Sequence, residues 1–230
     1  MKIIGHRGAA GLALENTIAS IKAAKKAGVD AIEFDIRMTS DEQFVLSHDQ
    51  TLSRVSPHHH VVKDVASEHL ADIVLHNGER LPTLTEALQA AGTTPVVIET
   101  KGSGWAAHLA KFLENYEPID ATVISFNHRE LGRFAKLAPA VPTFAIERTK
   151  PFDAIQFAKQ NKFTGVDMNF WLLNPLTYWM ARRKGLQIIV YTVNFRWIAW
   201  FLNLLFPAIS ITTNHPHAMQ FLRRKQSSRS

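Results

Sequence analysis

Residues 31–38 read Ala-Ile-Glu-Phe-Asp-Ile-Arg-Met, a run in which the side chains change character at every second position. Its charged side chains, Glu33, Asp35 and Arg37, alternate with apolar ones. Successive side chains of a strand point to opposite faces, so the three charges share one face. The apolar face predicts contact with helices, and the charged face then points to the other side of the sheet.

A short β-rich run followed by a helical pattern recurs along the whole chain. Eight runs are expected as strands, at 3–7, 31–38, 95–101, 122–126, 141–146, 163–168, 187–193 and 209–213. Helical patterns are expected at 17–27, 84–91, 103–117, 127–138, 151–162, 174–184, 195–206 and 215–225. Eight alternating units without a Gly-rich dinucleotide fingerprint favour an α/β fold of the closed (β/α)8 TIM-barrel type over an open sheet.

One segment interrupts this alternation. Residues 39–42 predict a turn and residues 43–47 a ninth short strand, which together indicate a hairpin at the barrel rim. Residues 49–82 are then expected as a small insertion beside the active site, because loops that follow barrel strands surround it. With 230 residues, 46% of them hydrophobic, the chain can bury one large core and is expected to form a single domain over 1–230.

Three carboxylates are predicted to meet inside the barrel. Glu99 follows the apolar residues 96–98 on the expected strand 95–101, and it should point inward as Glu33 and Asp35 do on the strand before. Lys101 lies on the same face of the strand as Glu99. Clustered carboxylates are costly to bury unless a cation lies between them. The chain has no cysteine, so oxygen ligands for one divalent cation, Mg²⁺ or Ca²⁺, are expected. The alternative is an internal salt-bridge network with Arg37 and Lys101.

Two histidines fall at strand ends on the same side of the barrel. His6 and Arg7 end the first strand, and His48 ends the rim strand beside Asp49. A single histidine is usually structural. Two of them beside three carboxylates suggest an acid and a base, as the cleavage of a phosphodiester requires.

These residues together resemble the glycerophosphodiester phosphodiesterase family, in its short, bacterial, barrel-only form. The motifs that carry the resemblance are His6-Arg7-Gly8, Glu15-Asn16-Thr17, Glu33-x-Asp35, His48-Asp49, Leu81-Pro82-Thr83-Leu84 and Glu99-x-Lys101. Weaker landmarks are Ser125-Phe126, Thr192-Val193-Asn194 and Thr212-Thr213. The match in order and spacing covers nearly the whole chain.

The resemblance implies a role for each of these side chains. Glu33, Asp35 and Glu99 would hold the divalent ion, and His6 and His48 would be the catalytic acid and base. Arg7 and Lys101 would bind phosphate oxygens. The implied reaction is metal-dependent hydrolysis of glycerophosphodiesters to glycerol 3-phosphate and an alcohol. Alternatives are a lysophospholipase D activity on lipids that keep one acyl chain, and a catalytically silent phosphate-binding protein.

The sequence departs from the family pattern at three positions. Leu14 stands where proline is usual, Tyr191 where tryptophan is frequent, and Asn214 where aspartate usually ends the last strand. None of the three is a proposed ligand or proton carrier. They therefore bear on the pocket wall and on substrate choice.

Two further segments, one aromatic and one rich in histidine, are candidate sites. Phe170 and Trp171 directly follow a strand, so they could line the mouth of the barrel, although most late aromatic residues are expected to pack. Residues 58–60 are three consecutive histidines, which cannot all face one ion in a strand. We expect them in an exposed loop and not at a second metal site.

The charge balance and the chain ends limit the partners. Lys and Arg exceed Asp and Glu by 26 − 20 = 6, which suggests an anionic partner. Part of the excess lies in the basic tail at 223–230, expected to be solvated, and no nucleic-acid motif accompanies it. The chain begins without an apolar leader pattern and has no cysteine, so a cytoplasmic location is expected.

Residues 196–206 predict a helix that is apolar nearly all round, with only Arg196 and Asn203 as polar side chains. It is too short to span a bilayer. Neighbouring elements could cover it. Otherwise it forms a surface for a homodimer or for peripheral membrane contact, and the single cation of the segment favours the dimer.

Overall fold

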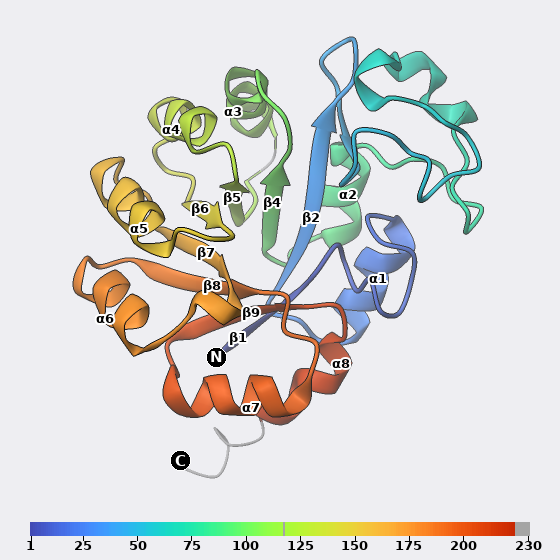
Figure 1. The fold of residues 1–230 in the computed structure, drawn as a ribbon. Helices are drawn as coiled ribbons and strands as arrows, with labels where there is room; N and C mark the ends of the chain where they lie inside the picture. Colours follow the sequence, from blue (N-terminus) through green and yellow to red (C-terminus); the bar gives the residue numbers. More distant parts are fainter. Residues whose placement is uncertain (117, 224–230) are drawn as a thin grey trace.

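The computed structural model describes residues 1–116 and 118–223, and within them the chain forms a nine-stranded sheet surrounded by helices (Figure 1). The strands are β1 (Lys2–Gly5), β2 (Ala31–Met38), β3 (Phe44–Leu46), β4 (Val96–Thr100), β5 (Ala121–Ser125), β6 (Thr143–Glu147), β7 (Gly165–Asn169), β8 (Gln187–Tyr191) and β9 (Ile209–Thr213). The α-helices are α1 (Ile18–Lys26), α2 (Leu84–Ala91), α3 (Trp105–Asn115), α4 (His128–Leu137), α5 (Pro151–Gln160), α6 (Pro175–Arg183), α7 (Arg196–Leu205) and α8 (Pro216–Met219).

The first strand closes the sheet into a barrel. It pairs in parallel with β2, where Ile4 lies opposite Ala31, and with β9, where Ile4 lies opposite Thr212. All other pairs in the ring are also parallel. The predicted (β/α)8 TIM-type barrel is therefore confirmed.

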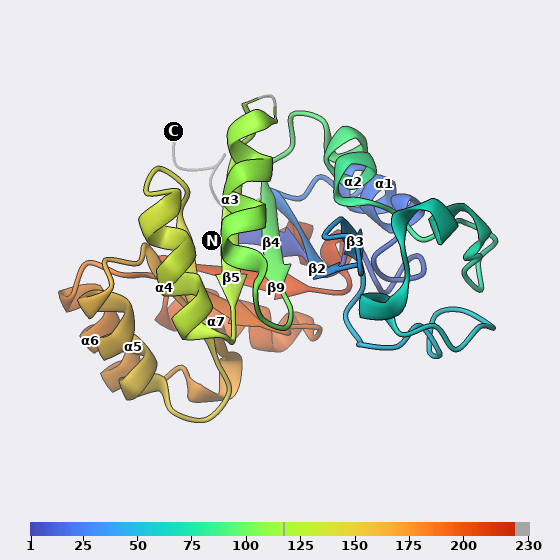
Figure 2. The ribbon, with the colours of Figure 1, turned by 90° about the horizontal axis from the view of Figure 1, so that it is seen from above.

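The predicted rim hairpin is also present. Strand β3 pairs antiparallel with the end of β2, with Met38 opposite Phe44. The segment 49–82 follows, with two 3₁₀ turns at Val62–Asp64 and Ser67–Asp72, and it projects beside the barrel (Figure 2). A small apolar cluster of its own, including Leu52, Val62 and Ile73, packs against Val45 of β3 and holds the segment to the rim.

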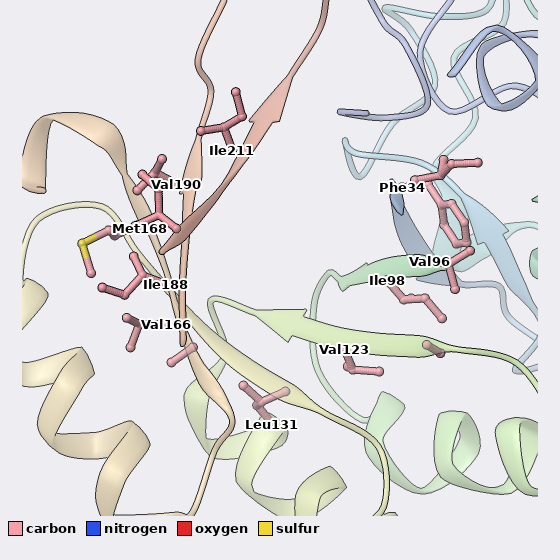
Figure 3. Packing of buried hydrophobic residues seen from close by; sticks show 14 of the residues in the cluster. Phe34, Val96, Ile98, Val123, Leu131, Val166, Met168, Ile188, Val190 and Ile211 are labelled. Atoms are coloured by element: carbon pink, nitrogen blue, oxygen red, sulfur yellow. The ribbon is translucent and has the colours of Figure 1, made fainter. Parts of the chain in front are cut away.

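The alternation of side chains divides the apolar core into two parts. Phe34, Ile98, Val123 and Met168 pack between the strands and the outer helices, as Figure 3 shows. Inside the barrel a smaller cluster, which contains Ile4, Val97, Ile124, Phe144, Ile146 and Ile189, fills the lower part. The carboxylates Glu33, Asp35 and Glu99 lie beyond this cluster, towards the end of the barrel where the strands finish.

Several predicted boundaries lie one or two residues from the observed ones, and the first strand and the last α-helix are the most informative cases. The first strand ends at Gly5 and not at residue 7. Arg7 (φ 49°) and Gly8 (φ 81°) adopt the left-handed backbone conformation, which is incompatible with an extended strand. The last α-helix ends at Met219 and not at residue 225, and a 3₁₀ turn over Gln220–Leu222 follows. There the amide of Gln220 donates to the carbonyl of Ala27 (2.6 Å).

Of the expected basic tail at 223–230, the structure describes only Arg223, which forms an ion pair with Asp30 (2.7 Å). The prediction for 224–230 lies outside the described residues. Among the residues that the structure describes, none of the helices has the length and hydropathy needed to cross a bilayer.

Candidate active site

A cavity of about 490 Å³ opens where the strands end. Polar and charged side chains from both halves of the barrel line it: His6, Arg7, Glu33, His48, Glu99, Lys101, Arg148, Asp167, Asn169, Thr192 and Thr212. Its apolar wall consists of Ile124, Phe126, Ile146, Phe170 and Tyr191. The C-terminal end of the strands is the usual position of the active site in a barrel of this type.

Three buried carboxylates lie together on neighbouring strands. Asp35 of β2 is in register with Glu99 of β4, and Glu33 is one inward position earlier on β2. One oxygen of each side chain lies within 4.8 Å of the others. Burial, and then the charge of Asp35, raises the pKa of Glu99 to about 7, and the same two causes raise the pKa of Glu33 well above its usual range. Without a bound cation, Glu33 and Glu99 therefore keep their protons to a higher pH than an ordinary carboxyl group does.

Two cations only partly balance this cluster. Lys101 Nζ lies 2.9 Å from Asp35 Oδ1 and also contacts Glu99 Oε1. Arg7 Nε lies 3.2 Å from Asp35 Oδ2. Burial would raise the pKa of Asp35, but Lys101 and Arg7 outweigh it and lower that pKa to about 2.

The arrangement fits a divalent cation better than a closed salt-bridge network. When all three carboxylates are ionised, Lys101 and Arg7 leave one net negative charge, and Arg7 is shared with Glu15 (2.7 Å). Glu33 Oε1 is buried and, within the described residues, has no hydrogen-bond partner. Arg37, expected in the network, instead donates to the carbonyl of His48 (2.8 and 3.1 Å). Carboxylate oxygens that lack a donor are the ligands a hard cation takes.

The two histidines face this cavity from two loops, one after β1 and one after β3, and each is held through Nδ1. His6 Nδ1 lies 2.6 Å from Asn214 Oδ1, after β9, and His48 Nδ1 lies 2.7 Å from Asp49 Oδ1. Burial, and then the charge of Arg7, lowers the pKa of His6 to about 4, and burial also lowers the pKa of His48. An acceptor at Nδ1 places the proton of a neutral ring there and leaves Nε2 free to accept one.

The sequence of the chain is similar to those of known proteins. Residues 6–224 match the profile of the "Glycerophosphoryl diester phosphodiesterase family". The chain belongs to this family. It is 33% identical over 211 residues to the YhdW protein of Bacillus subtilis strain 168, covering 84% of this chain and 86% of that protein. The predicted family and the predicted enzyme class, a phosphodiesterase, are thus confirmed.

Solved structures share the same barrel. One is an Oleispira antarctica phosphodiesterase in complex with the product sn-glycerol-3-phosphate, with a TM-score of 0.89, 21% identity and 97% of both chains covered. Another is a glycerophosphodiester phosphodiesterase from Thermotoga maritima, with a TM-score of 0.82 and 20% identity, covering 97% of this chain and 98% of that one. At these identities the likeness shows the fold.

The family motif Glu15-Asn16-Thr17 has a structural explanation here. Asn16 exchanges two hydrogen bonds with Asp35, and Thr17 caps α1 through its hydroxyl. Glu15 accepts from Arg7 and from Arg54, and Arg54 also donates to Asp49 (2.7 Å). Arg54 therefore links the loop of His6 to that of His48.

Sequence reasoning missed two charged residues of the cavity, Asp167 and Arg148. Asp167 on β7 points inward between the outward-facing Val166 and Met168, and its buried Oδ1 has no partner among the described residues. Burial, and then Glu99, raises the pKa of Asp167 well above its usual range. The period-two pattern of Glu33 and Asp35 could have found it. Arg148 stacks on Phe126 at 4.5 Å and follows no such pattern.

The three departures from the family pattern occupy different places. Asn214 holds His6, and Tyr191 lines the cavity and donates from its hydroxyl to the carbonyl of Glu147 (3.0 Å). Leu14 lies outside the cavity and packs on the apolar cluster of the insertion.

The aromatic pair after β7 and the three consecutive histidines lie at different places. Phe170 lines the cavity, whereas Trp171 is 76% exposed and does not. Residues 58–60 form an exposed loop outside the cavity, as expected. In this loop a hydrogen bond joins His59 Nδ1 and the Ser53 hydroxyl.

Proposed function

We propose that this family member hydrolyses glycerophosphodiesters to glycerol 3-phosphate and an alcohol. The observation that supports this most is the convergence of two histidines, two cations and three carboxylates on one cavity. Phosphodiester cleavage needs a proton acceptor, a proton donor and positive charge around one phosphate.

Glu33, Asp35 and Glu99 would hold one divalent cation, Mg²⁺ or Ca²⁺. When bound, such an ion polarises the phosphoryl group and stabilises the charge that develops on its oxygens. The unpartnered Glu33 Oε1 and the raised pKa of Glu99 support this assignment, since both describe an acidic cluster short of positive charge.

Arg7 and Lys101 would bind the non-bridging phosphate oxygens. Both line the cavity at its acidic end. Arginine offers a planar fork of donors and lysine a compact charge, so together they orient a phosphate and neutralise it. Their ion pairs with Asp35 hold both side chains in place before the substrate arrives.

His6 and His48 would move the protons. One ring, in its neutral form, takes the proton from the glycerol hydroxyl beside the phosphate, and the oxygen of that hydroxyl attacks phosphorus. The other ring must start in its protonated form, and it gives that proton to the departing alcohol. The product is a cyclic phosphate, which water opens to glycerol 3-phosphate with the two roles exchanged. Asn214 and Asp49 support this by fixing the Nδ1 side of each ring.

Lysophospholipids with one acyl chain are a second candidate substrate class. The chain is 35% identical over 113 residues to human Lysophospholipase D GDPD1, covering 44% of this chain and 36% of that protein. A silent phosphate-binding protein is disfavoured, because such a protein has no reason to keep buried charges that are costly to desolvate. The cytoplasmic location stays a prediction.

One assay tests the proposal. Purified protein is given a panel of glycerophosphodiesters and lysophospholipids, with Mg²⁺, with Ca²⁺ and with chelator, and the release of glycerol 3-phosphate, or of lysophosphatidic acid from the lysophospholipids, is measured. We expect release that depends on the cation. No release from any substrate, in a protein whose thermal midpoint shows it to be folded, would contradict the proposal.

A further inference from the structure

Helix α7 buries one apolar stripe and exposes a second one. Ile198, Ala199 and Leu202 are buried against the barrel. The stripe on the other side is exposed to solvent and consists of Trp197, Trp200, Phe201, Leu204 and Leu205. A barrel helix needs one apolar stripe for packing, so the second one has no function in the fold.

The elements next to α7 expose apolar side chains as well. Tyr178 of α6 packs on Phe206, just after α7, with ring centroids 5.1 Å apart, so the two helices are adjacent (Figure 1). Leu176 and Trp179 on α6, Trp171 before it and Phe195 before α7 are exposed as well. We call the nine exposed side chains the α6–α7 surface: Trp171, Leu176, Trp179, Phe195, Trp197, Trp200, Phe201, Leu204 and Leu205.

The tryptophans of the chain are concentrated on this surface. Of the five, Trp105 is buried in the core, and the other four all belong to the α6–α7 surface, with exposures of 48% to 76%. Tryptophan is enriched at the boundary between a lipid bilayer and water, because its ring is apolar while its N–H group can donate a hydrogen bond.

The charges of the same part of the chain have one sign. Residues 168–230 contain none of the 20 Asp and Glu of the protein and eight of its 26 Lys and Arg. Arg182, Arg183 and Arg196, on or next to the two helices, are exposed. Arg183 lies over the ring of Trp179 (5.0 Å), so cation and aromatic ring are presented together. An anionic surface matches this combination.

We propose that the α6–α7 surface docks the protein on an anionic lipid bilayer, with the side of the barrel against the membrane. The single cation within 196–206 favours a dimer when that segment is taken alone, but the structure places Arg183 of α6 over Trp179 of the same surface. In a two-fold dimer the patch would face itself and bring arginines of like charge together. A bilayer with anionic headgroups binds both the rings and the cations.

The surface also reaches the mouth of the barrel. Trp171 follows Phe170, which lines the active-site cavity, and Phe195 follows the loop that contains the cavity residue Thr192. Docking would therefore hold the cavity near the headgroups, where lysophospholipids are found. This last consequence rests on the proposed function, whereas membrane binding does not.

Vesicle flotation tests the proposal. Wild-type protein is mixed with phosphatidylcholine vesicles, with or without phosphatidylglycerol, and tryptophan fluorescence is recorded in parallel. We expect binding and a blue shift only with phosphatidylglycerol, both weakened by salt. Trp197→Ser with Leu204→Ser should lower the partition by about tenfold or more, because two apolar side chains no longer enter the bilayer.

The control removes equally exposed apolar side chains elsewhere. Leu137 on α4 and Val74 in the insertion are 57% and 41% exposed. Leu137→Ser with Val74→Ser should bind vesicles like wild type. Both double variants should hydrolyse a water-soluble glycerophosphodiester at the wild-type rate, so an inactive wild type would contradict the proposed function and leave the binding result intact.

Three outcomes would overturn the membrane proposal. One is the absence of wild-type binding to vesicles that contain phosphatidylglycerol. Another is equal binding by the Trp197/Leu204 variant. The third is a wild-type dimer in sedimentation that this variant converts to monomer, which would assign the surface to a second copy of the chain.

Discussion

Asn16 and Asp35 hold each other through two reciprocal hydrogen bonds. The Asn16 amide donates to Asp35 Oδ2 (2.9 Å), and the backbone N–H of Asp35 donates to Asn16 Oδ1 (3.0 Å). Both side chains are buried, and Asn16 has left-handed backbone (φ 56°). The loop after β1 thus fixes the orientation of a carboxylate on β2.

Replacing Asn16 by glycine should test this contact without straining the backbone. Asn16→Gly keeps the left-handed conformation but leaves buried polar groups of Asp35 unpaired, so the free energy of unfolding should fall by about 1–3 kcal/mol. Urea denaturation measures it. Lys162→Gly, at an exposed position with φ 58°, is the control and should change stability by less than about 0.5 kcal/mol. Equal effects of the two substitutions would mean that the side chain of Asn16 contributes nothing.

Cation binding should depend on pH through Glu99. Its pKa is raised to about 7, so below that pH a cation must displace a proton. The affinity for Mg²⁺ or Ca²⁺, measured by calorimetry, should fall by about tenfold or more for each pH unit below 7, because the pKa of Glu33 is raised as well. Glu99→Gln should remove most binding and activity with the fold intact, whereas Glu114→Gln, exposed on α3, should change neither. Full activity in chelator would refute the metal assignment.

The carboxylate cluster could be predicted because side-chain alternation is a local property of a strand. The positions of Glu33, Asp35 and Glu99 follow from counting along two strands whose outward faces are apolar. Arg54 could not be predicted in this way. Its bonds to Glu15 and Asp49 depend on how the insertion folds back onto the rim, which no short-range pattern specifies.

The ends of elements were predicted less well than their centres for a related reason. Strand β2 and helix α2 have the expected bounds, since alternation and a capping box at Thr83 mark them. The end of β1 depends on Arg7, a residue type that rarely takes a left-handed backbone. There the backbone N–H of Arg7 donates to Glu33 (2.7 Å), a tertiary contact that local propensity does not include.

The two histidines should both be required for turnover. His6→Ala and His48→Ala should each lower kcat by about two to four orders of magnitude, the usual effect of removing a positioned acid or base. His59→Ala is the matched control, because His59 lies in the exposed loop outside the cavity. The kcat values of the three variants are measured by steady-state kinetics on a glycerophosphodiester. A histidine whose variant keeps a near-normal rate is structural.

Lys101 should matter more for catalysis than for folding. Lys101→Met removes the donor expected on the phosphate, so kcat/KM should fall by about 10²–10³. Added cation should restore most of any loss in thermal midpoint, because it neutralises Asp35 and Glu99 in place of the lysine. Lys111→Met, exposed on α3, is the control. Unchanged kinetics in Lys101→Met would contradict the phosphate role.

Asn214 should set the pH range in which His6 is neutral. In wild type, burial and then Arg7 lower the pKa of His6 to about 4, below its ordinary value of 6.5. The stability that this group contributes is therefore present above pH 6.5 and lost as the pH falls towards 4. Asn214→Asp places a carboxylate against His6 Nδ1 and should raise the pKa of His6 by about 1–3 units.

The effect of Asn214→Asp should appear in two measurements. The acidic limb of the kcat/KM profile should move to higher pH, because His6 is protonated sooner, and the variant should lose less stability than wild type between pH 6.5 and 4. Asn77→Asp, which adds the same charge at an exposed position of the insertion, should change neither. If the acidic limb of Asn214→Asp coincides with that of wild type, His6 is not the group that sets it, and the hydrogen bond to Asn214 does not control catalysis.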